Sequence, residues 1–197
     1  MVRSHDALQD TALIAVFAAL IAVFSALVPG FAVGPVALTL QTLAVALTGL
    51  ILGPVRGAAA VLLYLAVGFA GLPVFSFGQA GLGVFGGGSI GYLLSFPFAA
   101  ALTGALARLA LRGRRRWLGG QLVGAALLSS VLLIHPAGIV GLMVNAHLGL
   151  VAAVVYDLRF WPGDILKCVL AGLIAVAVHR AFPALAARRG PVAPVVA

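Results

Sequence analysis

The sequence predicts an all-α integral membrane protein with six transmembrane helices. Three observations lead to this class: an apolar composition, a low content of charge, and long stretches without any charge. The chain has 197 residues, of which 63% are hydrophobic and 8% are charged, and its mean hydropathy is +1.22. A soluble domain carries about 25% charged residues, so a water-soluble globule is excluded. Intrinsic disorder is excluded because it requires low hydrophobicity.

The charge-free stretches give the number of spans. Charged residues are absent from 11–55, 57–107 and 117–156. A helical span needs about 20 apolar residues, so the first two stretches each hold two spans and the third holds one. A sixth span follows. Helices are predicted near residues 11–28, 38–53, 57–72, 91–111, 118–143 and 165–182 of a single domain, 1–197.

Two alternatives to this arrangement are excluded. A β-barrel needs short alternating segments, and the apolar runs do not alternate. A cleaved signal peptide has an apolar region of roughly 7–15 residues, shorter than the first run here. Asp6 and Asp10 also precede that run, where a signal peptide carries positive charge. The first segment is therefore interpreted as a retained helix.

The basic residues set the orientation. Lys and Arg gather in cytoplasmic segments of membrane proteins. With both termini in the cytoplasm, ten of the twelve basic residues lie inside: Arg3, Arg56, Arg108, Arg112, Arg114, Arg115, Arg116, Arg180, Arg188 and Arg189. The basic run 112–116 is then an anchor beside anionic lipid in the plasma membrane rather than a nucleic-acid site.

Composition argues against cofactor and metal chemistry. Cys168 is the only cysteine, and the histidines show no metal-ligand spacing, so no metal site and no cofactor are predicted. No G-x-x-x-x-G-K-[ST] segment is present. The chain therefore has no phosphate-binding loop of its own.

Three loops face outside in this topology, near residues 29–37, 73–90 and 144–163. The second is rich in glycine, apolar and uncharged, unlike flexible linkers, which are polar. We expect it to pack on the bundle as a lid. In the third, 147–156 is expected to form a short interfacial helix, with Asp157 and Arg159 solvated.

Asp164 and Lys167 are the strongest candidate site residues. Asp164 follows a Pro-Gly pair and could simply cap the last helix. Lys167, the only lysine, lies near the start of that helix, where the helix dipole disfavours a cation. The spacing of three residues puts both on one face. Ionisable groups inside a membrane point inward and mark function.

Weaker candidates are uncharged polar residues. Gln41 interrupts an apolar run near the outer end of the second span. It could join helices or offer a donor and an acceptor to a ligand. Tyr92 and Asn145 are candidates of the same kind.

One segment suggests an enzyme. Gly87-Gly88-Ser89-Ile90-Gly91 matches the G-x-S-x-G pattern of serine hydrolases. That pattern acts on a turn between a strand and a helix, and no strand is predicted here. An intramembrane serine hydrolase is kept as the alternative function, and Ser89→Ala would abolish its activity while leaving a binding protein largely intact.

Three separated motifs resemble the BioY family, the biotin-specific substrate-capture (S) components of energy-coupling-factor (ECF) transporters. They are GPVALTLQTLAVALTGLILGPVRGAAAVLLYLAVGFAGLPVF at 34–75, GYL at 91–93 and WPGDILK at 161–167. The resemblance covers nearly the whole chain. It departs where the family often has PVP and this chain has Pro35-Val36-Ala37. It also departs at 87–93, where the family usually has GPTGGYL.

The resemblance implies a non-enzymatic, multi-pass transport protein of the bacterial plasma membrane. Biotin would be held near the outer surface, under the loops after helices 1, 3 and 5. Asp164, Lys167 and Gln41 would meet its ureido ring or carboxylate, and Phe31, Phe75 and Tyr92 would pack its ring system. It also implies partners, namely a transmembrane coupling subunit and cytoplasmic ATPase subunits. Small residues on the first helix could admit a partner helix closely: Ala15, Ala18, Ala19 and Ala22.

Overall fold

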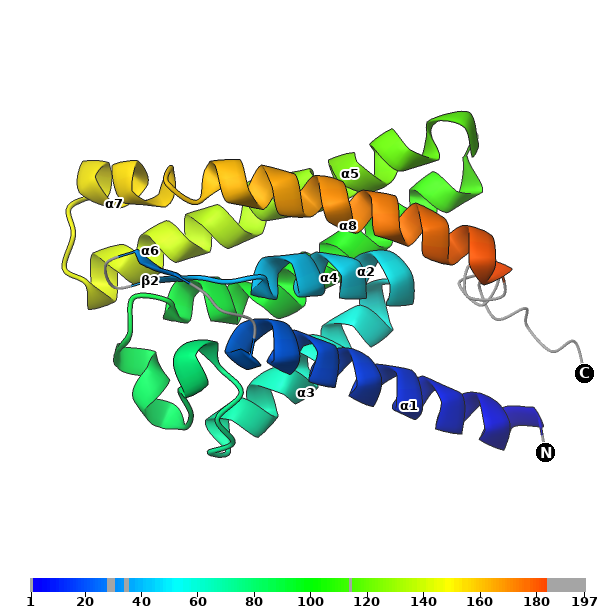
Figure 1. Cartoon of the computed structure of the whole chain (residues 1–197), viewed down its shortest axis with the longest axis horizontal. Helices are drawn as coiled ribbons and strands as arrows, with labels where there is room; N and C mark the ends of the chain where they lie inside the picture. The colour runs from blue at the N-terminus through cyan, green and yellow to red at the C-terminus, as the bar shows by residue number, and fades with distance from the viewer. Residues whose placement is uncertain (1, 28–30, 34–35, 114, 184–197) are drawn as a thin grey trace, which may run out of the picture.

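The computed structural model describes residues 2–27, 31–33, 36–113 and 115–183, and these form a helical bundle (Figure 1). The predicted helical class is confirmed. The helices are α1 (Val2–Ala22), α2 (Gln41–Leu52), α3 (Pro54–Phe69), α4 (Ile90–Arg112), α5 (Leu118–Ser129), α6 (His135–Asn145), α7 (Leu150–Asp157) and α8 (Trp161–Ala181). The short elements are the π-helical turns η1 (Val23–Leu27) and η5 (Ser130–Ile134), the 3₁₀ turns η2 (Ser76–Gly78), η3 (Leu82–Gly86) and η4 (Arg115–Trp117), and the strands β1 (Phe31–Val33) and β2 (Val36–Leu38).

Four helical segments are long and apolar enough to cross a membrane. They are Ala7–Ala26, Ile90–Arg112, Leu118–Asn145 and Trp161–Ala181. The third joins α5, η5 and α6 into one continuous segment. The helices α2 and α3 are shorter and equally apolar, and they meet at Gly53, which has a φ of 82°.

Some predicted boundaries are wrong. The first helix begins at Val2 rather than near residue 11, because charged residues limit burial in lipid but do not stop a helix. The helix α8 begins at Trp161 rather than near residue 165, because Pro162 fits the first helical turn, where its missing N–H costs nothing. Part of the predicted first loop instead forms an antiparallel ribbon that pairs Phe31 with Leu38.

The helix α4 lies at the centre of the bundle, in contact with α2, α3, α5 and α6. The helix α8 packs on α2 and α5, and α1 packs on α3 and α2 at the periphery. Figure 1 shows the start of α1 and the end of α8 at one end of the bundle. The ribbon, η2, η3 and α7 lie at the other end, called the loop end here. The connections that carry the predicted site residues are therefore gathered together.

Close helix contacts at the loop end depend on two glycines. Gly91 of α4 and Gly141 of α6 cross so tightly that a Cβ added at Gly141 would lie 2.8 Å from the backbone nitrogen of Gly91. Such small residues let helix backbones approach each other directly. This crossing fixes the position of Tyr92, the next residue of α4.

Candidate ligand-binding site

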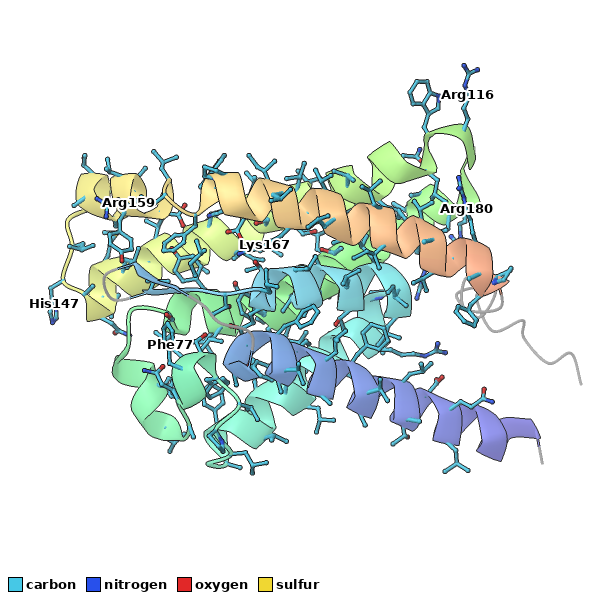
Figure 2. All side chains as sticks on the ribbon, viewed as in Figure 1. Phe77, Arg116, His147, Arg159, Lys167 and Arg180 are labelled. Atoms are coloured by element: carbon cyan, nitrogen blue, oxygen red, sulfur yellow. The ribbon has the colours of Figure 1, made fainter. Side chains whose placement is uncertain are left out.

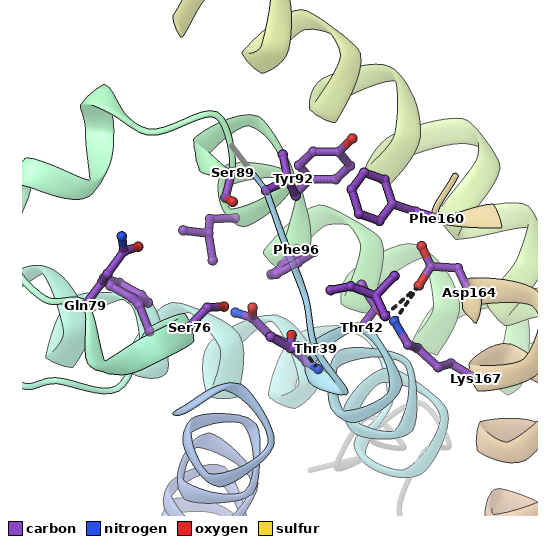
Figure 3. Close-up of a pocket in the computed structure, with 15 residues that line it drawn as sticks. Thr39, Thr42, Ser76, Gln79, Ser89, Tyr92, Phe96, Phe160, Asp164 and Lys167 are labelled. Carbon is purple, nitrogen blue, oxygen red and sulfur yellow. Dashed lines mark hydrogen bonds and ion pairs between the residues drawn. The ribbon is translucent and has the colours of Figure 1, made fainter. Parts of the chain in front are cut away.

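A pocket lies at the loop end, between the β-ribbon, α2, α4, α8 and the Gly-rich loop (Figure 3). It encloses about 570 Å³ of space between atoms, part of it open to solvent. Only about 50 Å³ of this space admits the centre of a water-sized sphere, so the walls of the pocket lie close together. The pocket is lined by Val36, Leu38, Thr39, Gln41, Thr42, Phe75, Ser76, Gln79, Ser89, Tyr92, Leu93, Phe96, Phe160, Asp164 and Lys167.

Asp164 and Lys167 lie together on the wall formed by α8. The Lys167 ammonium donates to Asp164 Oδ1 at 2.9 Å, and the Thr42 hydroxyl of α2 donates to the same oxygen at 2.9 Å. Both charged residues are 7% exposed. The capping role considered for Asp164 is wrong, because α8 begins at Trp161 and the side chain makes no capping bond. Its carboxylate instead joins α8 to α2 at the pocket.

Gln41 begins α2 and is 5% exposed. Its side-chain amide donates to the Tyr64 hydroxyl at 2.8 Å, and Tyr64 donates to Ser25 Oγ at 3.1 Å. The amide thus links α2 to α3 and η1. An amide offers a carbonyl acceptor as well as its donors. Gln41 therefore joins helices and also lines the pocket, the two roles that the sequence left open.

Aromatic rings form other parts of the pocket lining. Phe75 packs edge-on against Tyr64, with ring centroids 5.5 Å apart, and is 1% exposed. Tyr92 and Phe160 make a similar contact at 6.0 Å. The pocket therefore combines two buried charges with apolar walls, as expected for a ligand that has both polar and apolar parts.

The Gly-rich loop packs on the bundle, as its composition predicts. Phe75 and Val84 are buried in the main core, and Phe69 of α3 stacks near Phe85 at 4.8 Å. Phe75, Ser76, Gln79 and Ser89 of this loop line the pocket. Movement of the loop as a lid stays a prediction.

Asn145 lies away from the pocket lining. Its side-chain amide, at the end of α6, donates to the carbonyl oxygens of Phe85 at 2.7 Å and Gly87 at 3.0 Å. Asn145 therefore binds the Gly-rich loop and does not line the pocket. The side chain of Phe31 lies outside the described residues, and its backbone belongs to β1.

The four alanines predicted as a docking surface lie on α1 and differ in exposure. Ala15 and Ala19 are exposed, Ala22 is half-buried and Ala18 is 7% exposed. Ala18 belongs to the core of the bundle. A partner helix could therefore reach Ala15 and Ala19, and Ala18 faces the chain's own helices.

A second buried cluster adjoins the pocket, and the sequence did not reveal it. Asp157, expected to be solvated, is 1% exposed, so that expectation is wrong. It accepts hydrogen bonds from the Tyr92 hydroxyl at 2.8 Å and from the Trp161 indole at 2.9 Å. His135, 4% exposed, places Nδ1 2.9 Å from Asp157 Oδ2 and Nε2 3.9 Å from Asp164 Oδ2. The sequence signal for this cluster was only a histidine inside an apolar run.

Tyr156 of α7 contacts two residues that follow this helix, beside the same cluster. Tyr156 stacks near Phe160 with ring centroids 5.9 Å apart, and the Arg159 guanidinium lies 5.2 Å from the Tyr156 ring centroid. Burial raises the pKa of the Tyr156 hydroxyl, so the residue stays neutral. Arg159 is exposed, as expected.

The geometry around Ser89 does not match a nucleophile elbow. Ser89 follows the 3₁₀ turn η3 and precedes α4, whereas the elbow needs a strand before the serine. The Nε2 atom of the buried His135, which would have to face the serine in a hydrolase, faces Asp164 instead.

Comparisons with known proteins agree on one family. The BioY family model matches residues 1–184. A "Biotin transporter BioY" of Rhizobium etli is 38% identical over 187 residues, which span 91% of this chain and 98% of the relative. Another of that name from Rhodobacter capsulatus is 35% identical over 192 residues, 92% of this chain and 99% of the relative. The crystal structure of an S-component for biotin from an ECF-type ABC transporter superposes with a TM-score of 0.82 at 27% identity, covering 89% of this chain and 93% of that chain.

Proposed function

Because the chain belongs to the BioY family, we propose that it captures biotin in the membrane and serves biotin uptake as the S component of an ECF transporter. The resemblance drawn from three sequence motifs is thereby confirmed. The serine hydrolase alternative finds no support in the family, in the relatives or in the surroundings of Ser89.

The observation that carries the proposal is the buried Asp164–Lys167 pair on the wall of a pocket with aromatic sides. Biotin has a ureido ring with two N–H donors and one carbonyl acceptor, an apolar thiophane ring and an anionic valerate chain. These are the groups that a pocket of this composition can bind. The rings of Phe75, Tyr92 and Phe160 would pack the ring system.

The hydrogen bonds already made inside the protein narrow the roles of the two charges. Asp164 Oδ1 accepts from Lys167 and Thr42, whereas Oδ2 lies 3.9 Å from His135 Nε2 and keeps the capacity to accept a ureido N–H. An ammonium carries three donors, and the bond to Asp164 uses one of them. Lys167 could therefore donate to the ureido carbonyl or pair with the valerate carboxylate. Gln41 would complete the polar contacts at the end of α2.

The proposed topology has six spans with both termini in the cytoplasm and the pocket at the outer face. The distribution of basic residues supports it. Figure 2 shows Arg116 and Arg180 at the end of the bundle opposite the pocket, with Arg159 at the loop end and Lys167 between them. Four long apolar helices and the shorter α2 and α3 would supply the spans of a multi-pass plasma membrane protein.

Energy for transport would come from partner subunits. The sequence contains no phosphate-binding loop. Family membership implies a transmembrane coupling subunit and cytoplasmic ATPase subunits. We propose that the exposed side of α1, at Ala15 and Ala19, receives the coupling subunit. Ala18 and Ala22, predicted as part of the same surface, would serve mainly the packing of α1 on the bundle.

The direct test of function is to purify the chain in detergent and measure bound biotin by mass spectrometry. Co-purified biotin at near one molecule per chain is expected. Titration of ligand-free protein with biotin, and with riboflavin as an unrelated vitamin, adds the control. A chain that binds neither, or binds both equally, would contradict the proposal.

A further inference from the structure

Asp157, the last residue of α7, is a buried anion with three partners from three other segments. Its carboxylate accepts from Tyr92 of α4 at 2.8 Å and from Trp161 at the start of α8 at 2.9 Å. The third partner is His135 Nδ1, at 2.9 Å. A carboxylate only accepts hydrogen bonds, so Nδ1 carries a proton. Burying a charge is unfavourable unless it is fully paired, and this one is.

The bond to Tyr92 sets the orientation of a pocket-lining ring. The hydroxyl turns away from Phe96 and from the pocket centre, and the ring itself lines the pocket (Figure 3). Tyr92 is 8% exposed and also packs edge-on against Phe160, another lining residue. Loss of the bond to Asp157 would free this ring to rotate toward or away from a ligand.

The bond to His135 extends the cluster to the ligand-facing carboxylate. His135 lies where η5 meets α6, and its ring stacks on Trp161 with centroids 4.9 Å apart. Its Nε2 faces Asp164 Oδ2 at 3.9 Å. His135 does not line the ligand pocket, so it stands behind Asp164 as seen from that pocket. The imidazole therefore meets the carboxylate oxygen of Asp164 that Lys167 and Thr42 do not bond.

We propose that Asp157 and His135 are positioning residues for ligand binding: Asp157 orients Tyr92 directly, and His135 holds Asp164 toward the pocket. The proposal rests on the function proposed above. Neither Asp157 nor His135 lines the pocket. Asp157 lies 65 residues from Tyr92 in the sequence, and His135 lies 29 residues from Asp164.

The test compares four variants by biotin titration and by the midpoint of thermal unfolding, in the same detergent. Asp157→Asn keeps the shape but places an amide donor among three donors. Tyr92→Phe removes only the hydroxyl. His135→Asn keeps a donor near Nδ1 and loses the group at Nε2, whereas His135→Gln keeps a polar group near Nε2. Asp10→Asn is the matched control, because Asp10 of α1 pairs with Arg56 of α3 at 2.9 Å and neither residue lines the pocket.

We expect Asp157→Asn to bind biotin at least about tenfold more weakly, the scale of one lost hydrogen bond to a charged group. His135→Asn should cause a smaller loss, because the 3.9 Å contact between Nε2 and Asp164 is longer than a hydrogen bond. His135→Gln should recover part of the loss of His135→Asn. Tyr92→Phe should weaken binding, and adding it to Asp157→Asn should cost little more, because both changes break the same bond. Asp10→Asn should bind as the wild type does.

A purely structural role makes the opposite prediction. The unfolding midpoint would fall while folded variants kept wild-type affinity, and that result would overturn the proposal. Fully additive losses in the Asp157→Asn and Tyr92→Phe double variant would overturn the route through Tyr92. If Asp157→Asn does not fold, His135→Asn and Tyr92→Phe still decide, since wild-type affinity in both contradicts the proposal. Failure of the wild-type chain to bind biotin would instead refute the underlying function.

Discussion

Asn145 donates its side-chain amide to the carbonyl oxygen of Phe85 at 2.7 Å, which ties the end of α6 to the Gly-rich loop. A second bond from the same nitrogen reaches Gly87 at 3.0 Å. Four residues of this loop line the pocket: Phe75, Ser76, Gln79 and Ser89. The amide of Asn145 therefore holds the Gly-rich loop against the end of α6.

Removing the Asn145 amide should make the Gly-rich loop more mobile. Asn145→Ala is expected to increase the dissociation rate of biotin several-fold, because two loop carbonyls lose their donor. Spin labels at Gln79 and Arg159, measured by pulsed electron resonance, should show a broader distance distribution without biotin than with it. Gln121→Ala, which removes an amide from the exposed surface of α5, is the control. Identical distributions with and without biotin would contradict a moving lid.

The Asp164–Lys167 pair should dominate polar recognition. Asp164→Asn and Lys167→Ala are each expected to weaken biotin binding by at least tenfold, since a hydrogen bond to a charged group contributes about 1.5–3 kcal/mol. Thr42→Val should cause a smaller loss, because it removes one donor to Asp164 Oδ1. Isothermal titration on folded protein measures each affinity. Arg159→Ala, an exposed cation outside the pocket lining, should change little, and wild-type affinity in the Asp164 and Lys167 variants would refute the assignment.

The crossing of α4 and α6 should not tolerate a methyl group. Gly91→Ala would drive a Cβ into the Ala137 carbonyl oxygen, which belongs to rigid helix backbone. Overpacking of this kind costs about 1–3 kcal/mol, so the thermal unfolding midpoint should fall. Gly124→Ala is the matched control, because a Cβ there meets nothing within 4 Å. Alanine favours a helix over glycine by up to about 1 kcal/mol, so that midpoint should hold or rise. Equal midpoints in the two variants would contradict the close crossing.

The exposed side of α1 should be needed for assembly but not for capture. Of the apolar window in α1, 11% is buried, against 61% in α4, so α1 has an open face. Ala19→Trp should block pull-down by the coupling and ATPase subunits while biotin titration of the isolated chain stays unchanged. Leu128→Trp, an equally bulky change on the exposed side of α5, should assemble normally. Normal assembly of Ala19→Trp and Ala15→Trp would remove α1 as the docking surface.

Sequence reasoning succeeded where function left a local signal. Lys167 stood out because a lone lysine near a helix start has no structural reason to be there, and the structure buries it beside Asp164 in the pocket. Gln41 stood out as one amide in an apolar run. Packing of the Gly-rich loop followed from its lack of charged residues and its many apolar side chains. Each of these signals lies within a few neighbouring residues.

The sequence did not predict the cluster around Asp157, because most of its members lie far apart in the sequence. Asp157 lies beside Arg159 and Trp161 in a segment that suggests a solvated loop. Its buried partners Tyr92 and His135 come from α4 and the η5–α6 junction, and only the folded bundle brings them together. The π-helical turns are similarly invisible, because periodicity detects helices but not a single wider turn. Side-chain contacts of Phe31 lie outside the described residues, so its role stays a prediction.

The π-helical turn η5 makes the number of residues between α5 and α6 a requirement of the site. A π turn accommodates one more residue than an α-helical turn, and such turns recur at functional sites. Deleting a single residue within Ser130–Ile134 would let α5 and α6 join as one regular helix, and it would remove the wide turn that directly precedes His135. Natural variation by single-residue deletion should therefore be excluded from this turn, whereas substitutions at its exposed positions Val131 and Leu132 should be accepted.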